Sequence, residues 1–291
     1  MPNAPGPLLD VAKPNLFVGV DAGGSRTVAA LARGREIVRT FEAKPANPNV
    51  VGLDGAAQII ASAIESVLAG VCAAAIVAGV AGAGSDDVQE RLRRLLETRF
   101  PGVPVAVTHD ARVALRAAVP EGDGIVLIAG TGSIAYAELD GSGLFAGGYG
   151  YLLGDRGSGY AIGAAGLREQ VDAGDRELLV RLYRLPSPVV EIAGHARIVL
   201  EQAAAGDDYA LRIVHEAAED LLELIASIVE KCGRPALPLA FSGGLLREPN
   251  VLSQRLEQRI AEEWLDVTVV EKRTEPYTGA LALARGLGAV S

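Results

Sequence analysis

The sequence contains few of the residues that form disulfide frameworks or metal sites built from histidine and cysteine. Two cysteines, Cys72 and Cys232, and three histidines occur in 291 residues. Cysteines this far apart form no CxxC motif, and two of them do not make the disulfide framework of a small secreted domain. This usage fits the reducing cytosol, so we expect a cytoplasmic protein. Three scattered histidines argue against a multi-histidine metal site.

Basic charge is also scarce. The formal net charge is −9 and the isoelectric point is about 5.0. Because a protein must present a basic surface to neutralise a phosphate backbone, this balance argues against nucleic acid as a partner. Nucleotides remain compatible with it, because backbone N–H groups and a divalent metal ion can bind their phosphates.

Long uninterrupted apolar runs and an N-terminal targeting pattern are absent as well. The segment 67–84 most resembles a membrane span, but its closing glycines indicate a helix end followed by a buried strand. The first 15 residues lack the basic-then-apolar order of a signal peptide and predict a flexible tail. We therefore expect no membrane association.

The sequence does contain a hydrophobic fraction of 49%, enough for a folded core, and a length typical of one large or two ordinary domains. A three-strand pattern occurs twice, beginning at Leu16 and again at Ile125, which indicates an internal structural repeat. The predicted strands are Leu16–Val20, Val28–Leu31, Glu36–Phe41, Ala74–Val80, Val103–Val107, Ile125–Ala129, Ile134–Leu139, Gly143–Phe145, Leu237–Phe241 and Asp266–Val270.

Helical periodicity alternates with these strands, so we expect a mixed α/β architecture. A loop rich in Pro and Asn is predicted at 44–52, before the first helix. The predicted helices are Asp54–Leu68, Asp86–Phe100, Ala111–Ala118, Gly159–Val171, Arg176–Tyr183, Pro188–Ala204, Asp208–Lys231, Val251–Glu263 and Thr278–Leu287.

Two glycine-rich turns follow matching strands in the two halves, at Asp21–Thr27 and Gly130–Ser133. Such turns present backbone N–H groups and small hydroxyls to an anion. Gly23 and Gly24 permit positive φ and close backbone approach, and Asp21 can hold hydrated Mg²⁺. Each turn alone is equally typical of a ligand-free hairpin. Their matching places favour phosphate held between two halves.

Asp110 follows a predicted strand and opens a helix. Ligands of α/β proteins collect at such strand ends, where an aspartate can accept the proton of a hydroxyl that attacks phosphorus. The alternative is a helix N-cap, the commoner role of aspartate at this place.

Two further segments are rich in glycine. Gly147–Gly159 has six glycines in thirteen residues, which favours a loop that wraps a ligand or moves. A flexible surface loop is the alternative, but its Tyr and Leu residues at 149 and 151–153 predict partial burial. Ser242-Gly243-Gly244 breaks a buried strand, so a flat ring could lie against the backbone, although an ordinary turn has the same pattern.

Taken in order, these motifs resemble the sugar kinase branch of the actin/hexokinase/Hsp70 ATPase superfamily, and more narrowly the BadF/BadG/BcrA/BcrD ATPase family. VGVDAGGSRT, VLIAGTGS and LAFSGGLL are similar to its two phosphate motifs and its adenosine motif. AGGYGYLLGDRGSGYAIG is similar to its GGWGxxxGDEGSxxxIG segment, with Tyr149 in place of Trp and Arg156 in place of Glu. The resemblance covers Leu16–Leu287.

The resemblance implies two ribonuclease H-like (actin-like ATPase) domains with a cleft between them. They would span 16–120 and 121–291 after the tail at 1–15, with a last helix at about 278–289 packing back on the N-terminal domain. It also implies the cofactors ATP and Mg²⁺ and a role for each residue. Asp110 is the general base; Asp21 organises Mg²⁺ through water; Gly23, Gly24, Ser25, Thr27, Thr131 and Gly132 contact phosphates; Gly243 and Gly244 pack on adenine; Asn47, Asp110, Thr131, Gly148 and Asp155 contact the sugar.

We therefore expect an ATP-dependent kinase that phosphorylates the primary hydroxyl of N-acetylglucosamine. Glucosamine, N-acetylmuramic acid and glucose stay open as substrates, as does a non-catalytic sugar sensor. The family's electron-transfer ATPases hold an iron–sulfur cluster on paired cysteines, which this chain lacks. The helices between Glu169 and Lys231 offer surface for a homodimer.

Overall fold

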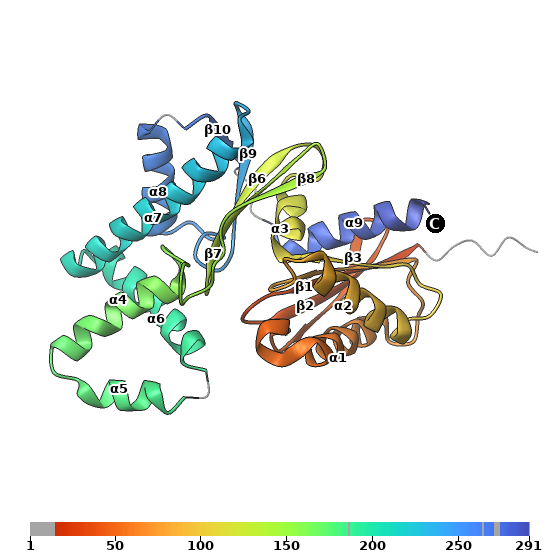
Figure 1. Ribbon diagram of the computed structural model, residues 1–291, viewed down its shortest axis with the longest axis horizontal. Helices are drawn as coiled ribbons and strands as arrows, with labels where there is room; N and C mark the ends of the chain where they lie inside the picture. The colour runs from red at the N-terminus through yellow and green to blue at the C-terminus, as the bar shows by residue number, and fades with distance from the viewer. Residues whose placement is uncertain (1–14, 186, 264, 271–273, 291) are drawn as a thin grey trace, which may run out of the picture.

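The computed structural model describes residues 15–185, 187–263, 265–270 and 274–290. It consists of two lobes that lie side by side, each built on a five-stranded mixed sheet (Figure 1). Their strand orders are β3-β2-β1-β4-β5 and β10-β9-β6-β7-β8. All but residue 15 of the predicted tail lies outside the described residues. The expected α/β class is observed.

The N-terminal sheet forms from a meander followed by two parallel strands. The antiparallel strands are β1 (Leu16–Ala22), β2 (Thr27–Arg33) and β3 (Glu36–Ala43). The parallel ones are β4 (Ala75–Val80) and β5 (Val105–His109), which ends two residues later than predicted. Because β1, β4 and β5 run parallel, their carboxyl ends meet at one edge of the sheet.

The C-terminal sheet repeats this plan. Its meander is β6 (Gly124–Ala129), β7 (Ser133–Leu139) and β8 (Ser142–Gly147). Two strands parallel to β6 complete it, namely β9 (Leu237–Ser242) and β10 (Val267–Val269). The predicted internal repeat is therefore present, and the second meander again ends its first strand in a glycine turn.

Helix α1 (Pro48–Leu68) begins earlier than predicted, within the expected Pro/Asn loop. Pro48 fits the first turn of a helix because its missing N–H would have no partner there. Gly52, with φ of 75°, interrupts the helical backbone and kinks the element. Among the described helices, α1 alone is long and apolar enough to cross a membrane, yet nine of its residues are buried against the first sheet and α2 (Asp86–Arg99).

Two helices join the lobes. α3 (Asp110–Ala118) leaves the N-terminal sheet and packs on β6 and β7 of the other one. α9 (Pro276–Val290), from the end of the chain, covers the N-terminal sheet and packs along α3 (Figure 1). The segment that carries Asp110 is thus held by both lobes and by the last helix.

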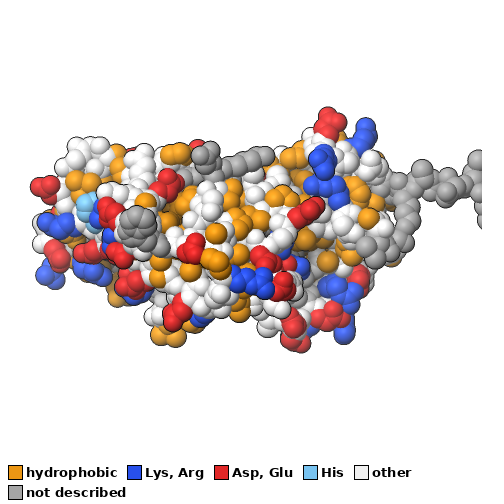
Figure 2. Space-filling model, turned by 90° about the horizontal axis from the view of Figure 1, so that it is seen from above, with side chains coloured by type: hydrophobic (Ala, Val, Ile, Leu, Met, Phe, Trp, Pro, Cys, Tyr) orange, Lys and Arg blue, Asp and Glu red, His pale blue; other side chains and the backbone are white. Residues whose placement is uncertain are grey.

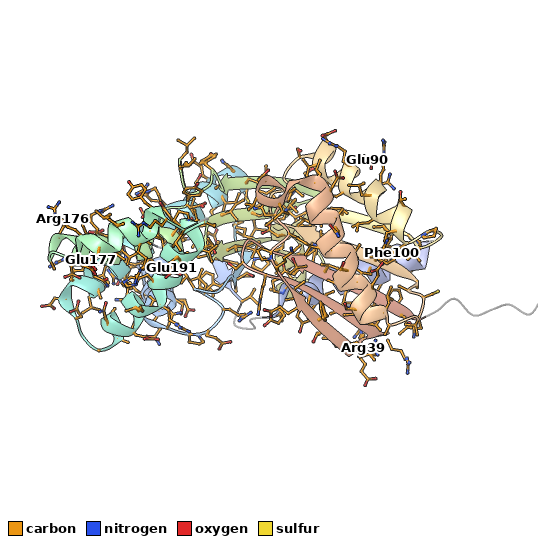
Figure 3. All side chains as sticks on the ribbon, turned by 90° about the horizontal axis from the view of Figure 1, so that it is seen from below. Arg39, Glu90, Phe100, Arg176, Glu177 and Glu191 are labelled. Atoms are coloured by element: carbon orange, nitrogen blue, oxygen red, sulfur yellow. The ribbon has the colours of Figure 1, made fainter. Side chains whose placement is uncertain are left out.

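The remaining helices enlarge the C-terminal lobe. They are α4 (Gly159–Asp172), α5 (Arg176–Tyr183), α6 (Pro188–Ala204), α7 (Asp208–Cys232) and α8 (Val251–Glu262). α7 supplies a long buried face to the core of this lobe. Arg176 and Glu177 of α5 lie at the opposite end of the molecule from Arg39 and Phe100 (Figure 3). On the face of Figure 2, acidic and basic side chains are interspersed.

Candidate active site

Asp110 is the first residue of α3 and directly follows β5, so it lies at the carboxyl edge of the N-terminal sheet. The predicted alternative, an N-cap aspartate, is wrong: the cap is His109, whose Nδ1 accepts from the Arg112 N–H at 3.1 Å. The Asp110 carboxylate accepts from the backbone of Ala111 at 3.0 Å. Burial raises the pKa of Asp110 to about 6. Its carboxylate is therefore more basic than usual, as a general base requires.

Asp21 is the penultimate residue of β1 at the same edge, paired with Gly79 of β4. Burial, and then the negative charge of Asp110, raise its pKa to about 7, which places the two carboxyls within electrostatic reach of each other. The described residues include no group of three or more His, Cys, Asp or Glu side chains able to hold a metal. Mg²⁺ commonly uses only one or two carboxylates, with waters and phosphate oxygens completing its shell, so Asp21 fits a Mg²⁺ site.

The first glycine turn is open. Gly23 N–H donates to the Arg26 carbonyl at 2.9 Å and closes the hairpin. The expected use of positive φ at Gly23 and Gly24 is not seen, since neither residue adopts it. A Cβ added at Gly24 would meet no described atom within 4 Å. The fold therefore does not demand glycine at 24, and its absent side chain leaves the backbone accessible to a ligand.

Hydrogen bonds from α4 and from the glycine-rich loop hold the second turn, Gly130–Ser133. Gly159 and Tyr160 at the start of α4 donate to the carbonyls of Gly130 and Thr131, at 2.7 and 3.2 Å. Ser133 Oγ donates to the Arg156 carbonyl at 2.7 Å, and its N–H donates to Asp155 at 3.3 Å. The turn is thus fixed by two backbone bonds from α4 and by two bonds between Ser133 and the end of the glycine-rich loop.

The two turns meet. Ser25 Oγ and Thr131 Oγ1 lie 2.8 Å apart, within hydrogen-bond distance, although 106 residues separate them. This contact joins the N-terminal lobe to the C-terminal one directly at the two motifs that the sequence assigns to phosphate. An anion between them would face backbone N–H groups and hydroxyls from both sides.

Ser242-Gly243-Gly244 lies beside the second turn. Gly243 has φ of 88°, and a Cβ there would lie 2.3 Å from the Ala129 carbonyl, so the turn itself requires glycine. At Gly244 a Cβ would meet no described atom within 4 Å. Leu245 N–H donates to the Ala129 carbonyl at 3.0 Å, which ties the two segments together. Gly244 is the residue here with an open face for a flat ring.

Thr27 differs from its neighbours in the first turn. Its side chain is fully buried at the start of β2, and no described group bonds its Oγ1. Of the four residues assigned to phosphate there, Gly23, Gly24 and Ser25 reach the surface while Thr27 does not. Direct phosphate contact by Thr27 would require a rearrangement of the hairpin.

The three remaining sugar candidates divide between the lobes. Asn47 caps α1, accepting from Asn49 N–H at 2.9 Å, and its side chain lies against Gly82 just after β4. It therefore shares the sheet edge with Asp21 and Asp110. Asp155 instead lies against the second turn, because a Cβ at Gly132 would be 2.7 Å from its Oδ2. Gly148, with φ of 76°, packs on Ile134.

Of the four apolar residues of the glycine-rich loop, only Tyr151 is partly buried as expected, with its ring 5.2 Å from that of Tyr160; the other three are largely exposed. Tyr149, Leu152 and Leu153 are 70%, 77% and 86% exposed, because the loop projects from the lobe between β8 and α4. Arg156, at the loop's end, forms ion pairs with Asp220 and Glu223 of α7. Its charge is thus used within its own lobe.

Sequence reasoning missed the packing that positions Asp110. A Cβ at Gly79 would lie 2.2 Å from a methyl of Val113, and one at Gly279 would lie 2.0 Å from the Val113 carbonyl. α3 therefore approaches β4 and α9 more closely than any side chain would permit. No local pattern marks these glycines, because the contacts lie far apart in sequence.

An ion network centred on the buried Glu138, also missed, joins α3 to β7. Arg112 and Arg116 bind Glu138 at 3.0 and 2.9 Å, and Tyr136 Oη donates to it at 3.2 Å. Burial opposes ionisation of Glu138, but the bonds from Arg116 and Arg112 outweigh it and hold its pKa low. The His109 ring also packs edge-on against Tyr136, 4.5 Å between centroids.

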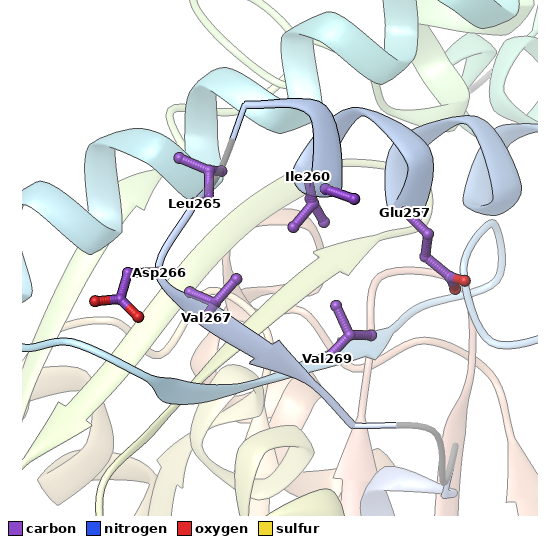
Figure 4. Close-up of a pocket in the computed structure, with 7 residues that line it drawn as sticks. Glu257, Ile260, Leu265, Asp266, Val267 and Val269 are labelled. Atoms are coloured by element: carbon purple, nitrogen blue, oxygen red, sulfur yellow. The ribbon is translucent and has the colours of Figure 1, made fainter.

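A separate hollow of about 580 Å³ lies between α8 and β10 (Figure 4). Its lining is mostly aliphatic, including Ile260, Leu265 and Val267, and it includes none of the residues assigned to substrate or nucleotide. We therefore place the active site at the facing turns and not in this hollow.

Comparisons with known proteins agree with the motifs. The model of the BadF/BadG/BcrA/BcrD ATPase family matches residues 18–284. An N-acetylmuramic acid/N-acetylglucosamine kinase of Clostridium acetobutylicum is 25% identical, and an N-acetyl-D-glucosamine kinase of Dictyostelium discoideum is 28% identical; each match covers 92% of this chain and 97% of the relative. A crystal structure provisionally named N-acetylglucosamine kinase, from Chromobacterium violaceum, has a TM-score of 0.71 at 25% identity, over 94% of this chain and 99% of that one.

These matches confirm the resemblance drawn from the sequence and the expected fold, two α/β halves of the actin-like ATPase kind. The roles assigned to individual residues rest on the geometry above, which brings together the two carboxylates, the two glycine turns and the open face of Gly244.

Proposed function

The chain belongs to the BadF/BadG/BcrA/BcrD ATPase family, and from this premise we propose that it is an ATP-dependent kinase that phosphorylates the primary hydroxyl of N-acetylglucosamine. One observation carries the proposal beyond the family. The two phosphate turns touch through Ser25 and Thr131 at the sheet edge where Asp110 and Asp21 lie. A phosphate chain and an acceptor hydroxyl can be held together there.

In this proposal Asp110 accepts the proton of the attacking hydroxyl. The raised pKa of its carboxyl, about 6, leaves it ionised near neutral pH yet more basic than a solvent-exposed aspartate. Asn47 and Gly148 contact the sugar from opposite lobes, and Asp155 contacts it or supports the turn on which it lies. Lobe closure around both substrates would exclude water, which is the competing acceptor.

The phosphate chain is bound by Gly23, Gly24 and Ser25 from one lobe and by Thr131 and Gly132 from the other, with Thr27 behind them. Gly243 and Gly244 pack on adenine, the latter with its open face. Asp21 would hold Mg²⁺ through water, and the bound ion would supply positive charge to phosphate oxygens. The enzyme stabilises the charge that spreads over the transferring group mainly by positioning these donors.

The relatives' names support the substrate. Both curated relatives are named for N-acetylglucosamine, and one of them also for N-acetylmuramic acid, which makes the latter the second candidate. Glucosamine, glucose and a non-catalytic sensor remain alternatives.

We further propose domains at 16–120 and 121–291, and a cytoplasmic location. We also propose a homodimer that forms through the α4–α7 region, where α5 exposes Leu179, Val180 and Tyr183.

A panel of sugars with Mg-ATP tests the proposal. We expect ADP release that depends on N-acetylglucosamine and yields its 6-phosphate, seen by mass spectrometry. If the enzyme prefers N-acetylmuramic acid or glucose, that sugar is the substrate in place of N-acetylglucosamine. ATP turnover without any phosphosugar, or sugar binding without turnover, would contradict the kinase assignment. Size-exclusion chromatography with light scattering tests the dimer.

A further inference from the structure

The nucleotide site assigned so far contains no cationic side chain. It consists of glycines, hydroxyls and the acidic pair Asp21 and Asp110, while the chain as a whole carries a formal charge of −9. A nucleoside triphosphate brings several more negative charges to this edge. Divalent metal offsets only part of them, so the site needs positive charge from the protein.

Two arginines from opposite lobes meet beside this edge. Arg26 belongs to the first phosphate turn, and Arg247 lies three residues after Gly244. Glu275 binds both: Arg247 Nη1 donates to its two carboxylate oxygens at 2.9 and 3.0 Å, and Arg26 Nη2 lies 3.6 Å from Oε2. Arg26 also pairs with Glu42 of β3 at 3.1 Å.

These groups lie close enough to Asp21 to affect its ionisation. After burial and Asp110, the charges of Arg26, Glu275 and Arg247 all act on the pKa of Asp21, the arginines lowering it. The guanidinium groups therefore stand at the metal and phosphate end of the cleft. No sequence motif assigned them a role there.

The ion pairs are not buried. The side chains of Arg26, Arg247 and Glu275 are 43%, 32% and 36% exposed. Pairs with this exposure contribute little to stability, because water screens the charges and the side chains lose freedom on pairing. A phosphate group offers a guanidinium the same bidentate geometry as a carboxylate and more negative charge, so it can replace Glu275.

We propose that Arg26 and Arg247 are the cationic ligands of the nucleotide's phosphate chain, and that Glu275 is the counter-ion that occupies them until nucleotide binds. The inference rests on the proposed nucleotide site. Because one arginine comes from each lobe, a phosphate chain bound by both draws the lobes together. Glu275, just before α9, opposes this exchange by competing for the same guanidinium groups.

The test is calorimetric titration of the full chain with ADP and with adenosine, in buffer free of divalent metal and sugar. Arg26→Gln and Arg247→Gln should each weaken ADP binding about 10-fold or more, from the loss of a charged hydrogen bond, and leave adenosine affinity unchanged. Glu275→Gln should tighten ADP binding. Arg234→Gln is the matched control, because Arg234 pairs with Asp123 and Asp140 at the other end of the C-terminal sheet.

Unchanged ADP affinity in both arginine variants would overturn the inference, as would an equal loss for adenosine, which indicates a structural role. Weaker ADP binding by Glu275→Gln would refute the counter-ion role. If a glutamine variant unfolds, Arg26→Lys and Arg247→Lys keep the charge and should retain most ADP affinity while losing the bidentate part. A chain whose arginines bind ADP but which phosphorylates no sugar refutes the kinase proposal alone; a sugar kinase indifferent to both arginines refutes this inference alone.

Discussion

The two lobes use the same strand-and-turn plan but contribute different chemistry. The N-terminal sheet edge carries the two carboxylates with raised pKa values, Asp21 and Asp110, and an open turn with an unobstructed Gly24. The C-terminal edge carries a turn tied by backbone bonds to α4, with Asp155 against it. In the proposed mechanism, one half supplies negative charge and the general base, and the other supplies a turn held by bonds to α4.

This difference explains why α3 matters more than its length suggests. It starts with Asp110 yet packs on the C-terminal sheet through Arg112, Arg116 and Glu138. The carboxylate proposed as the general base belongs to one lobe and is therefore positioned by contacts with the other. Changes to the two carboxylates should mainly affect turnover, and changes to the second turn should mainly affect nucleotide binding.

Asp110→Asn should have the largest effect. It removes the base while keeping size and the bond to the Ala111 N–H, so kcat should fall about 10²- to 10⁴-fold with ADP affinity little changed. Steady-state kinetics and ADP titration measure the two quantities. Asp54→Asn, at an exposed position of α1, is the control and should be neutral. Near-full turnover by Asp110→Asn would remove Asp110 from the mechanism.

Gly79→Ala should reduce both stability and turnover indirectly, because it displaces α3 and with it Asp110. The new methyl group meets Val113, and the displaced α3 moves Asp110, so we expect a loss of about 1–3 kcal/mol in unfolding free energy and about 10- to 100-fold in kcat. Gly79→Ala with Val113→Ala restores space and should recover part of both losses. Gly84→Ala, where a Cβ meets no described atom within 4 Å, is the matched control.

The pH dependence of catalysis and of stability tests the two carboxyls of the N-terminal half. Asp21, with a pKa of about 7, and Asp110, with a pKa of about 6, must both be ionised for their proposed roles. As the pH falls, kcat/KM should therefore decrease about tenfold per pH unit between 7 and 6, and about 100-fold per unit below 6, where both groups bind protons. The free energy of unfolding, measured without nucleotide, should instead decrease as the pH rises. Folded carboxyls with raised pKa keep protons that the unfolded chain has released, so their contribution is lost as pH rises from 4 to 7.

Urea unfolding across this pH range measures the stability part. The chain with Asp21→Asn and Asp110→Asn should lose less stability between pH 4 and 7 than the unaltered one. An identical slope for both would show that the two carboxyls are not the buried, proton-retaining groups described here.

Asp155→Ala should have the smallest effect, and it tests the second turn. Loss of the acceptor for Ser133 N–H loosens the second turn, so KM for ATP should rise about 5- to 10-fold with kcat nearly constant. Asp155→Asn keeps an oxygen acceptor, so its KM for ATP should lie between those of the unaltered chain and of Asp155→Ala. A rise confined to KM for the sugar would instead favour the sugar contact that the family resemblance implies.

The sequence was most informative where structure is local. Most strand and helix positions and the two glycine turns follow from patterns a few residues long. It was least informative where a residue's surroundings come from elsewhere. The exposure of Tyr149 and Leu153 and the burial of Thr27 depend on segments that no short pattern identifies.

By itself, the sequence determined that two similar α/β halves each end a strand in a glycine turn, and that Asp110 opens a helix at a strand end. Only the tertiary structure decided which groups share one site: that Ser25 meets Thr131, that Gly79 admits Val113, and that Glu275 joins Arg26 to Arg247. The physical reason is that turns and caps are fixed by bonds between neighbours. Site electrostatics depend instead on burial and on charges brought together from distant parts of the chain.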